Sequence, residues 1–289
     1  MAKPIYKWTG GKGRLLQKYD DLGFFPDPGQ FDTFVDLFFG AGAVTCWVAE
    51  RYPDKNLIIN DLNSEMMSIH LQMRNNWKEF REHFLRISEV FINTPQDRRK
   101  ALYNCYKKRY AWNYKFMSEA ELAANLLVMM KTNFNGIWQS YIMYGRRYST
   151  PPGKVDYKAS AFDIDKLEQF REVLCRATVL NVSFNEVVIP NHSWVFADPP
   201  YRDTKKMYSD QFTDELQSEL AAYLQKQDCI YAESNKEIGD GFWDSHFPDA
   251  QLHYLDHKYT CGHGGAVNPV TEVLIKNYGD PIERAVLPI

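Results

Sequence analysis

The sequence predicts an α/β protein in which a mainly parallel sheet, built from both ends of the chain, is interrupted by a mainly helical insertion. Near the N-terminus, a buried strand pattern leads through a glycine-rich turn into a helix and a second strand, the order of a parallel βαβ unit. Strand and helix patterns alternate again over 178–277. We therefore expect one domain of residues 1–61 plus 176–289 and an inserted domain of residues 62–175.

The individual elements follow from hydrophobic periodicity and from residues that begin or end helices. The first part contains strand patterns at 33–38 and 56–60 around a helix pattern at 43–51. The insertion shows helical patterns at 63–91, 96–116 and 118–131, the last opened by a capping box, and then a hairpin turn at Tyr144-Gly145. The last part contains strand patterns at 178–182, 193–197, 228–232 and 271–277, with a helix at 213–225.

Composition excludes several classes of protein. The chain has 289 residues, of which 45% are hydrophobic and 25% charged, as in ordinary folded proteins. No apolar run approaches the roughly 18 residues of a membrane span, and the first residues lack the apolar segment of a signal peptide. The five cysteines are scattered without a Cys-x-x-Cys pair, which disfavours disulfides and zinc. We expect a cytoplasmic protein that needs no membrane and no metal.

The net charge of −3 hides an uneven distribution. Between Arg98 and Met117 lie seven basic residues and no acidic one, interleaved with tyrosine and tryptophan. A basic, aromatic-rich segment in an otherwise acidic chain favours binding to nucleic acid. A solvated helix face with tyrosines packed beneath it would give the same pattern, so charge alone does not decide.

Two glycines occupy the turn between the first strand and its helix, in Phe39-Gly40-Ala41-Gly42. A residue without Cβ lets a ligand approach such a turn closely. Asp61 lies 21 residues beyond Gly40 at the end of the next strand, a position from which a carboxylate reaches a ribose hydroxyl pair. Thr45 replaces the third glycine of Gly-x-Gly-x-x-Gly, so the loop alone suits NAD, FAD or S-adenosylmethionine.

A sharper motif is Asp198-Pro199-Pro200-Tyr201, which directly follows the strand pattern at 193–197. Two prolines fix φ and remove two N–H donors, so the loop is stiff. The Asp198 carboxylate and the Pro199 carbonyl can accept the two hydrogens of an amino group on a flat ring, and Tyr201 can stack on that ring. Open α/β sheets bind ligands at this carboxyl edge.

Together these motifs resemble the Dam-type DNA adenine-N6 methyltransferases (D12 class, alpha group). The similar segments are Lys7 to Lys12, Asp36 to Val44, Asn60 to Asn63, 133–137, 151–154, Asp198 to Tyr201 and 271–275, in the order of that family. The resemblance implies a Rossmann-like, seven-stranded methyltransferase sheet with an inserted DNA-recognition domain. It also implies S-adenosylmethionine as the methyl donor and transfer to N6 of an adenine flipped out of double-stranded DNA.

The resemblance, with the basic segment, assigns roles to individual residues. Catalytic residues would be Asp198, Pro199, Pro200 and Tyr201. The cofactor would be bound by Trp8, Lys12, Phe39, Gly40, Gly42, Asp61, Ser183, Phe184 and Asp198. DNA would be contacted by Lys7, Arg99, Lys108, Asn133, Asn135, Gln139, Arg146 and Arg147. Gln139 stands where the family commonly has arginine; glutamine suits adenine and arginine suits guanine, which puts the usual GATC target in doubt.

Three other interpretations stay open at this point. The same catalytic motif could methylate adenine in structural RNA. An NAD-dependent oxidoreductase would explain the glycine loop but leave Asp198 to Tyr201 without a role, and a non-catalytic DNA-binding module would explain only the basic segment. The sequence does not decide between a monomer and a weak dimer, whether a cognate restriction endonuclease exists, or what the glycine-rich loop at 260–268 contacts.

Overall fold

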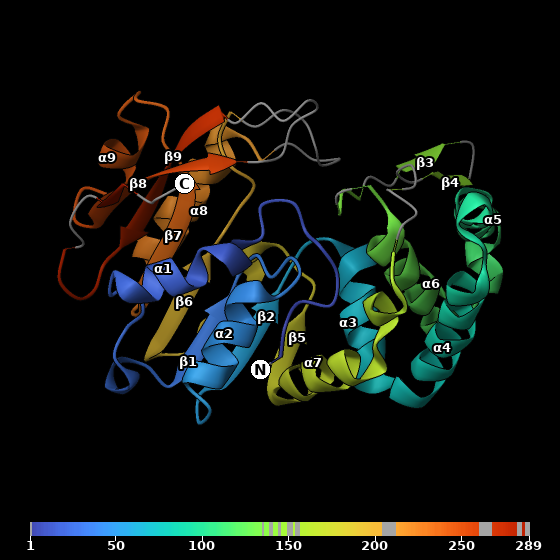
Figure 1. The fold of residues 1–289 in the computed structure, drawn as a ribbon. Helices are drawn as coiled ribbons and strands as arrows, with labels where there is room; N and C mark the ends of the chain where they lie inside the picture. Colours follow the sequence, from blue (N-terminus) through green and yellow to red (C-terminus); the bar gives the residue numbers. More distant parts are fainter. Residues whose placement is uncertain are drawn as a thin grey trace.

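The computed structural model describes residues 2–134, 136–138, 141–143, 146–148, 153, 157–203, 212–259, 268–281 and 285–286. Within these residues one large sheet has the strand order β10-β8-β9-β7-β6-β1-β2-β5 (Figure 1). Its strands are β1 (Thr33–Asp36), β2 (Asn56–Asn60), β5 (Ala177–Leu180), β6 (Ser193–Ala197), β7 (Ile230–Lys236), β8 (Gln251–Tyr259), β9 (Asn268–Lys276) and β10 (Ala285–Val286). Only β9 pairs antiparallel, with β7 and β8. The expected seven strands are therefore joined by the two-residue edge strand β10.

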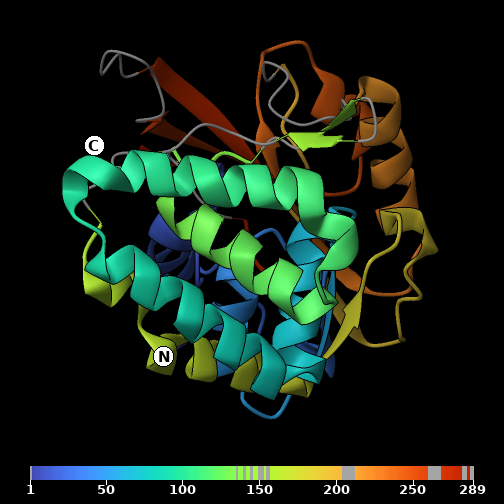
Figure 2. The same cartoon turned by 90° about the vertical axis from the view of Figure 1, so that its right-hand side faces the viewer.

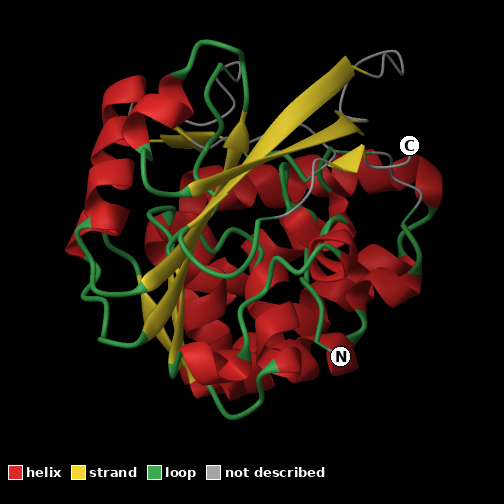
Figure 3. Ribbon diagram, turned by 90° about the vertical axis from the view of Figure 1, so that its left-hand side faces the viewer, coloured by secondary structure: helices red, strands yellow, loops and turns green. Residues whose placement is uncertain are grey.

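Helices cover both faces of this twisted sheet (Figure 3). They are α1 (Leu16–Asp21), α2 (Ala43–Arg51), α3 (Ser64–Asn75), α4 (Trp77–Asn93), α5 (Gln96–Asn113), α6 (Glu119–Thr132), α7 (Ile164–Arg176), α8 (Asp214–Gln225) and α9 (Phe242–His246). One apolar cluster packs α8 and α9 against one face of the sheet, through residues such as Leu220 and Trp243. A larger cluster fills the other face and continues into the insertion. The expected helix at 43–51 is confirmed residue for residue.

The insertion is built around α6, which contacts α3, α4 and α5 (Figure 2). Every residue of α6 from Ala123 to Met130 is buried, because helices surround it; a helix that is apolar all round is a buried helix. The Ser118 hydroxyl caps α6 by accepting a hydrogen bond from the Glu121 N–H at 3.2 Å, which is one half of the predicted capping box. The Glu121 carboxylate pairs with Arg86 and Arg109 instead of completing the box. The short hairpin of β3 (Tyr141–Met143) and β4 (Arg146–Tyr148) follows α6.

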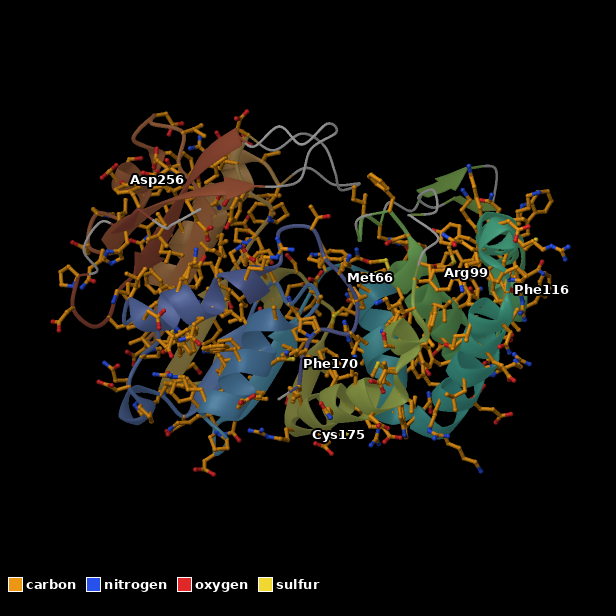
Figure 4. All side chains as sticks on the ribbon, in the orientation of Figure 1. Met66, Arg99, Phe116, Phe170, Cys175 and Asp256 are labelled. Carbon is orange, nitrogen blue, oxygen red and sulfur yellow. The ribbon has the colours of Figure 1, made fainter. Side chains whose placement is uncertain are left out.

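The insertion and the sheet share one apolar core. Phe170 on α7 contacts the rings of Phe39, from the glycine loop, and His70, on α3, and lies at the junction between the two parts (Figure 4). Although α7 falls inside the expected range of the insertion, it contacts α2 and β5 and so covers the sheet. The domain boundaries proposed from the sequence therefore stay a prediction.

Strand order places three loops together. The chain runs from β1 through β2 to β5 on one side of β1, and returns to form β6 and β7 on the other side. Because β6, β1, β2 and β5 are parallel, the segments that follow them lie along one edge of the sheet. The change of direction between β1 and β6 is the switch point at which open α/β sheets bind ligands.

Some elements escaped the sequence analysis. The helices α1, α7 and α9 and the strands β8 and β10 were not expected, and β7 begins and ends later than the predicted strand at 228–232. In β8 both His253 and Leu255 are buried while Leu252 and Tyr254 are half-buried, so apolar and polar residues do not alternate. The turn at 144–145 lies outside the described residues, although β3 and β4 pair on either side of it.

Two expectations from composition can be compared with the described residues. Within that part of the chain, every helix is too short or too polar to cross a membrane. The described cysteines, at positions 46, 105, 175 and 229, are all free thiols. Cys261 lies outside the described residues.

Candidate active site

The glycine loop after β1 requires glycine at two positions. Gly40 and Gly42 have φ angles of +53° and +79°, in the left-handed region that residues with a Cβ rarely adopt. A Cβ at Gly40 would lie 3.0 Å from the Trp8 indole, and one at Gly42 would lie 2.5 Å from the Phe39 ring. Trp8 therefore lies directly against the loop. Phe39, expected at the cofactor, places its side chain in the core beneath the loop.

The base of the loop is held by buried polar side chains. The Thr45 hydroxyl donates a hydrogen bond to the Asp36 carboxylate at 2.6 Å, and burial raises the pKa of Asp36 to about 7. The Asn60 amide donates to the carbonyls of Leu37 and Val182. Asn60 thereby joins the carboxyl ends of β1 and β2 to the segment after β5, so the three loops keep a fixed relative position.

Asp61 follows β2 and contacts the glycine loop. Its two carboxylate oxygens accept hydrogen bonds from the Gly40 N–H at 2.8 Å and the Asn63 N–H at 2.9 Å. Burial raises the pKa of Asp61 while these two donors lower it. Leu62, the next residue, is 64% exposed and so offers an apolar side chain beside the carboxylate. Nothing in the sequence marks a leucine as exposed, so Leu62 was not among the predicted site residues.

Asp198 follows β6, the strand next to β1. Its Oδ1 atom accepts hydrogen bonds from the Lys12 ammonium at 2.5 Å and from the Ser234 hydroxyl at 2.8 Å. Burial raises the pKa of Asp198, and the Lys12 charge opposes that shift. The same ammonium lies 4.7 Å from the centre of the Tyr201 ring. The structure thus brings Lys12, expected at the cofactor, onto the catalytic motif, and adds Ser234 from β7.

A pair of buried amides braces the Asp-Pro-Pro-Tyr loop from behind. The Gln217 amide donates to the Pro200 carbonyl at 2.9 Å, and the Asn235 side-chain oxygen accepts from the Arg202 N–H at 3.1 Å. Asn235 also donates to Gln217 at 3.0 Å. The pair satisfies backbone groups on both sides of Tyr201, and fully bonded buried polar groups of this kind favour a single geometry.

Arg202 fastens the far end of the same loop. Its guanidinium contacts the carboxylates of Asp214 and Asp240, each at 2.8 Å, and its centre lies 3.8 Å from the centre of the Phe242 ring. The hydrogen bonds that Arg202 donates to Asp214 and Asp240 outweigh burial and raise the pKa of Arg202, so the guanidinium stays charged. The catalytic loop is therefore tied to the starts of both α8 and α9.

Glu233 on β7 lies behind Asp198 and predicts a pH dependence. Its side chain is fully buried, and burial raises the pKa from its ordinary value of 4.5 to about 8. A carboxyl whose pKa is higher in the folded state stabilises the fold below its unfolded pKa, and this contribution is lost as pH rises through the folded pKa. In the wild type the free energy of unfolding should therefore fall as pH rises from about 5 to 8. Glu233→Gln should make that fall smaller, because the neutral amide cannot ionise.

Chemical denaturation at several pH values would measure this dependence. The matched control is Glu219→Gln, which removes an exposed carboxylate from α8 rather than a buried one from β7. Equal pH dependence in the wild type and Glu233→Gln would show that Glu233 ionises in the folded protein as it does in the unfolded chain.

The segment after β5 also reaches this edge of the sheet. The Asn181 amide donates to the Asp61 carbonyl at 2.6 Å. Ser183 forms a capping box with Glu186, and the buried Phe184 ring packs on Phe38, 5.9 Å between ring centres. Ser183 and Phe184, both expected at the cofactor, therefore lie in the segment that Asn181 ties to Asp61.

The start of the expected DNA-reading segment packs on residues 7–12, which we call the N-terminal strip. At Gly136, where φ is +72°, a Cβ would lie 2.4 Å from the Lys7 carbonyl oxygen. Lys7 itself is exposed. The Asn133 amide donates to the Ile137 carbonyl at 2.7 Å, and the side chain is only 9% exposed. Asn133 therefore shapes this turn rather than presenting its amide to solvent.

Glu65 on α3 anchors the next residues. It accepts hydrogen bonds from the Tyr110 hydroxyl at 2.5 Å and the Trp138 indole at 2.8 Å, while Tyr110 and Trp138 pack edge to face. Trp138 directly precedes Gln139, which with Asn135 lies outside the described residues. Arg146 and Arg147 belong to β4. The backbone that leads to Gln139 is thus fixed by a buried contact between two helices.

The basic helix α5 uses its cations in two ways. Arg99 donates to the carbonyls of Thr94 and Tyr157, both at 3.0 Å, and lies 4.3 Å from the centre of the Tyr157 ring. It therefore fastens the helix to a neighbouring segment. Lys108 is exposed. Arg99 lies within the helical part, whereas the largely exposed Phe116 projects from its outer edge (Figure 4).

The fold and the site define the class of protein. A Rossmann-like sheet with a glycine loop after β1, an acidic residue after β2 and Asp-Pro-Pro-Tyr after β6 is a methyltransferase sheet. The chain belongs to the D12 class N6 adenine-specific DNA methyltransferases, whose family model matches residues 8–261. It is a site-specific DNA methyltransferase that acts on N6 of adenine, and this excludes the oxidoreductase and the non-catalytic binding module.

Three similar proteins are named as type II methyltransferases. The type II methyltransferase M.MjaIII of Methanocaldococcus jannaschii is 26% identical, with 78% of this chain and 81% of that protein covered. M1.LlaDCHI of Lactococcus lactis subsp. cremoris is 26% identical over 96% of each chain. M.CviBI of Paramecium bursaria Chlorella virus NC1A is 23% identical, with 96% of this chain and 100% of that protein covered. The similarity to the last two therefore includes the helical insertion.

Proposed function

We propose that S-adenosylmethionine is the methyl donor and that Asp198 and the Pro199 carbonyl act on the amino group of an adenine flipped out of DNA. The observation that carries the proposal is the convergence of three loops. The glycine loop, Asp61 and Asp198 follow β1, β2 and β6, which are neighbouring parallel strands. A nucleoside bound at Asp61 would therefore lie on the same edge as the catalytic motif.

The residues beside Asp61 fit a nucleoside sulfonium. The Asp61 carboxylate retains lone pairs for ribose hydroxyls, since each oxygen accepts only one backbone hydrogen bond and can accept more. The exposed Leu62 gives an apolar surface for a base. Trp8, packed on Gly40, closes the glycine loop. S-adenosylmethionine, when bound there, supplies a methyl group on a sulfonium that a nucleophile can displace.

Asp198 and its loop would stabilise the attacking nitrogen. The lone pair of adenine N6 is spread into the ring, so attack requires that nitrogen to become tetrahedral and positively charged. Asp198 and the Pro199 carbonyl accept hydrogen bonds from its two N–H groups. These bonds stabilise the charged transition state more than the neutral ground state. Tyr201 stacks on the ring. Extruding the base from the duplex costs a few kcal/mol, which contacts elsewhere on the DNA must offset.

The insertion would supply those DNA contacts. We propose that Lys7, Gln139, Arg146 and Arg147 face the bases and nearby phosphates, because the segment after α6 packs directly on Lys7. Asn133 holds the segment that leads to Gln139 through its hydrogen bond to the Ile137 carbonyl, and Asn135 stays a proposed DNA contact. Among the cations of α5, Lys108 is the better candidate for a phosphate contact, since Arg99 is engaged by two carbonyls and a ring.

Transfer of a labelled methyl group tests the proposed donor, base and nucleic acid together. The protein is incubated with labelled S-adenosylmethionine and either a randomised duplex library or a structured RNA, and the product nucleoside is identified. We expect N6-methyladenine in duplex DNA within one short sequence, which sequencing of the library would define. Labelling of the RNA alone, or of another atom, would overturn the proposal.

Lys108→Ala should weaken DNA binding without changing the recognition site. A lysine that contacts a phosphate contributes about one unit to the dependence of log K on log salt concentration. Fluorescence anisotropy at several salt concentrations measures that slope for cognate and unrelated duplexes. Lys226→Ala is the control, because Lys226 is exposed at the end of α8. A changed methylation motif in Lys108→Ala would assign Lys108 to base reading instead.

A further inference from the structure

Lys12 takes up an unusual position for a cofactor residue. Its side chain is 1% exposed, and its ammonium contacts Asp198 Oδ1 at 2.5 Å and lies 4.7 Å from the centre of the Tyr201 ring. A third contact, to the Gly10 carbonyl, is longer, at 3.4 Å. These partners come from the loop after β6 and from the strip just before Lys12, so the ammonium sits inside the catalytic motif.

The target adenine needs the same two partners. In the proposed reaction its amino group donates to Asp198 and its ring stacks on Tyr201. The target amino group and the Lys12 ammonium would therefore make the same two contacts. Each would donate a hydrogen bond to the Asp198 carboxylate and lie against the Tyr201 ring. The two cannot occupy that position together.

Charge explains why a cation rests there. The Asp198 side chain is only 18% exposed, and burial raises its pKa while the Lys12 ammonium beside it lowers that pKa. Buried carboxylates are costly unless a cation compensates them, and an ammonium over an aromatic ring gains a cation–π contact as well. During methyl transfer, N6 itself becomes positive at this position. In the free protein the Lys12 ammonium thus provides the positive charge beside Asp198 that the adenine N6 provides during methyl transfer.

We propose that Lys12 holds the target-amino position in the free protein and that the flipped adenine must displace it. This proposal rests on the proposed function, because it assumes that Asp198 and Tyr201 receive the target base. The chain around Lys12 allows such a movement: Gly10, Gly11 and Gly13 flank it, and Gly10 has a φ of +83°. The target base could then enter only after the Lys12 ammonium leaves Asp198.

Binding without the cofactor tests the competition directly. The duplex carries the site found in the library, with the target opposite an abasic position, and the target is either adenine or purine, which lacks the amino group. The ratio of the two dissociation constants measures the contribution of the amino group. We expect a ratio near one in the wild type and about tenfold in Lys12→Met, because a hydrogen bond to a free carboxylate is worth that much.

Ser234→Ala is the matched control. Ser234 also donates to Asp198 Oδ1, but it is fully buried on β7, so its removal should leave Lys12 in place and the ratio near one. Thermal melting shows whether each variant is folded, and Lys12→Gln replaces Lys12→Met if the latter is not. A folded Lys12 variant with a ratio near one overturns the proposal.

The two proposals fail in different ways. If Asp198→Ala still methylates adenine, the proposed function is wrong whatever the ratio. If Asp198→Ala is inactive and the ratio in Lys12→Met equals that of the wild type, only the role of Lys12 is wrong. A ratio of about ten in the wild type itself would also contradict occupation by Lys12, since the amino group would then reach Asp198 unhindered.

Discussion

Replacing Asp198 by alanine is expected to lower the single-turnover rate of methyl transfer by at least ~10²-fold, as for loss of one preorganised partner of a developing charge. Asp198 lies at the end of β6, and its loop is fixed by Gln217, Asn235 and Arg202. The acceptor is therefore placed before the reaction begins. Rapid-quench measurements with excess enzyme would give the rate of the chemical step.

Asp198→Asn provides the matched control for this prediction. Asparagine keeps the shape and one acceptor oxygen, which Lys12 and Ser234 can still contact, but it removes the negative charge. We expect it to fold normally and to transfer methyl groups slowly, which separates the loss of charge from damage to the loop. An alanine variant that kept more than about a third of the wild-type rate would remove Asp198 from catalysis.

Asp61→Ala is expected to weaken binding of S-adenosylmethionine by about 1.5–3 kcal/mol, the value of hydrogen bonds to a charged acceptor. Asp61 is half-buried beside the glycine loop, and both of its oxygens already accept hydrogen bonds from backbone N–H groups, so its position is fixed before a ligand arrives. Calorimetry would measure the change. DNA affinity in the absence of cofactor should stay close to that of the wild type.

Asn63→Ala is the control that isolates the ribose contact. Asn63 caps α3 by accepting a hydrogen bond from the Met66 N–H at 3.1 Å, so its loss disturbs the same turn while leaving the Asp61 carboxylate in place. We expect Asn63→Ala to lower stability with little effect on cofactor affinity. Equal losses of affinity in both variants would assign Asp61 to holding the turn rather than to binding ribose.

The local features of this protein were predictable from sequence because each depends on residues close together in the chain. The strand–glycine loop–helix unit at 33–60 was predicted within two residues, since the buried run, the glycines and Pro53 all lie within it. The strand before Asp198 was predicted at 193–197, as found. The hairpin was predicted only as a turn at 144–145, because its strands are three residues each.

Contacts between distant segments could not be predicted in this way. Lys12 and Asp198 are 186 residues apart, and they meet only because the N-terminal strip crosses the edge of the sheet where β6 ends. Ser234 joins them because β7 pairs with β6. In the same way, the composition of α5 made Arg99 and Lys108 equivalent cations. In the structure Arg99 donates hydrogen bonds to two backbone carbonyls, whereas Lys108 is exposed to solvent.

The sequence by itself determined the chemical groups: the glycine turn, the acid after the second strand, the Asp-Pro-Pro-Tyr loop and the basic helix, and with them the family. Only the tertiary structure decided which groups share a site. The strand order β6-β1-β2 brings Asp198 and Asp61 to one edge, and the crossing of the N-terminal strip places Lys12 on the catalytic carboxylate. Burial then sets their charges, because a carboxylate removed from water requires a partner, and that partner comes from a distant part of the chain.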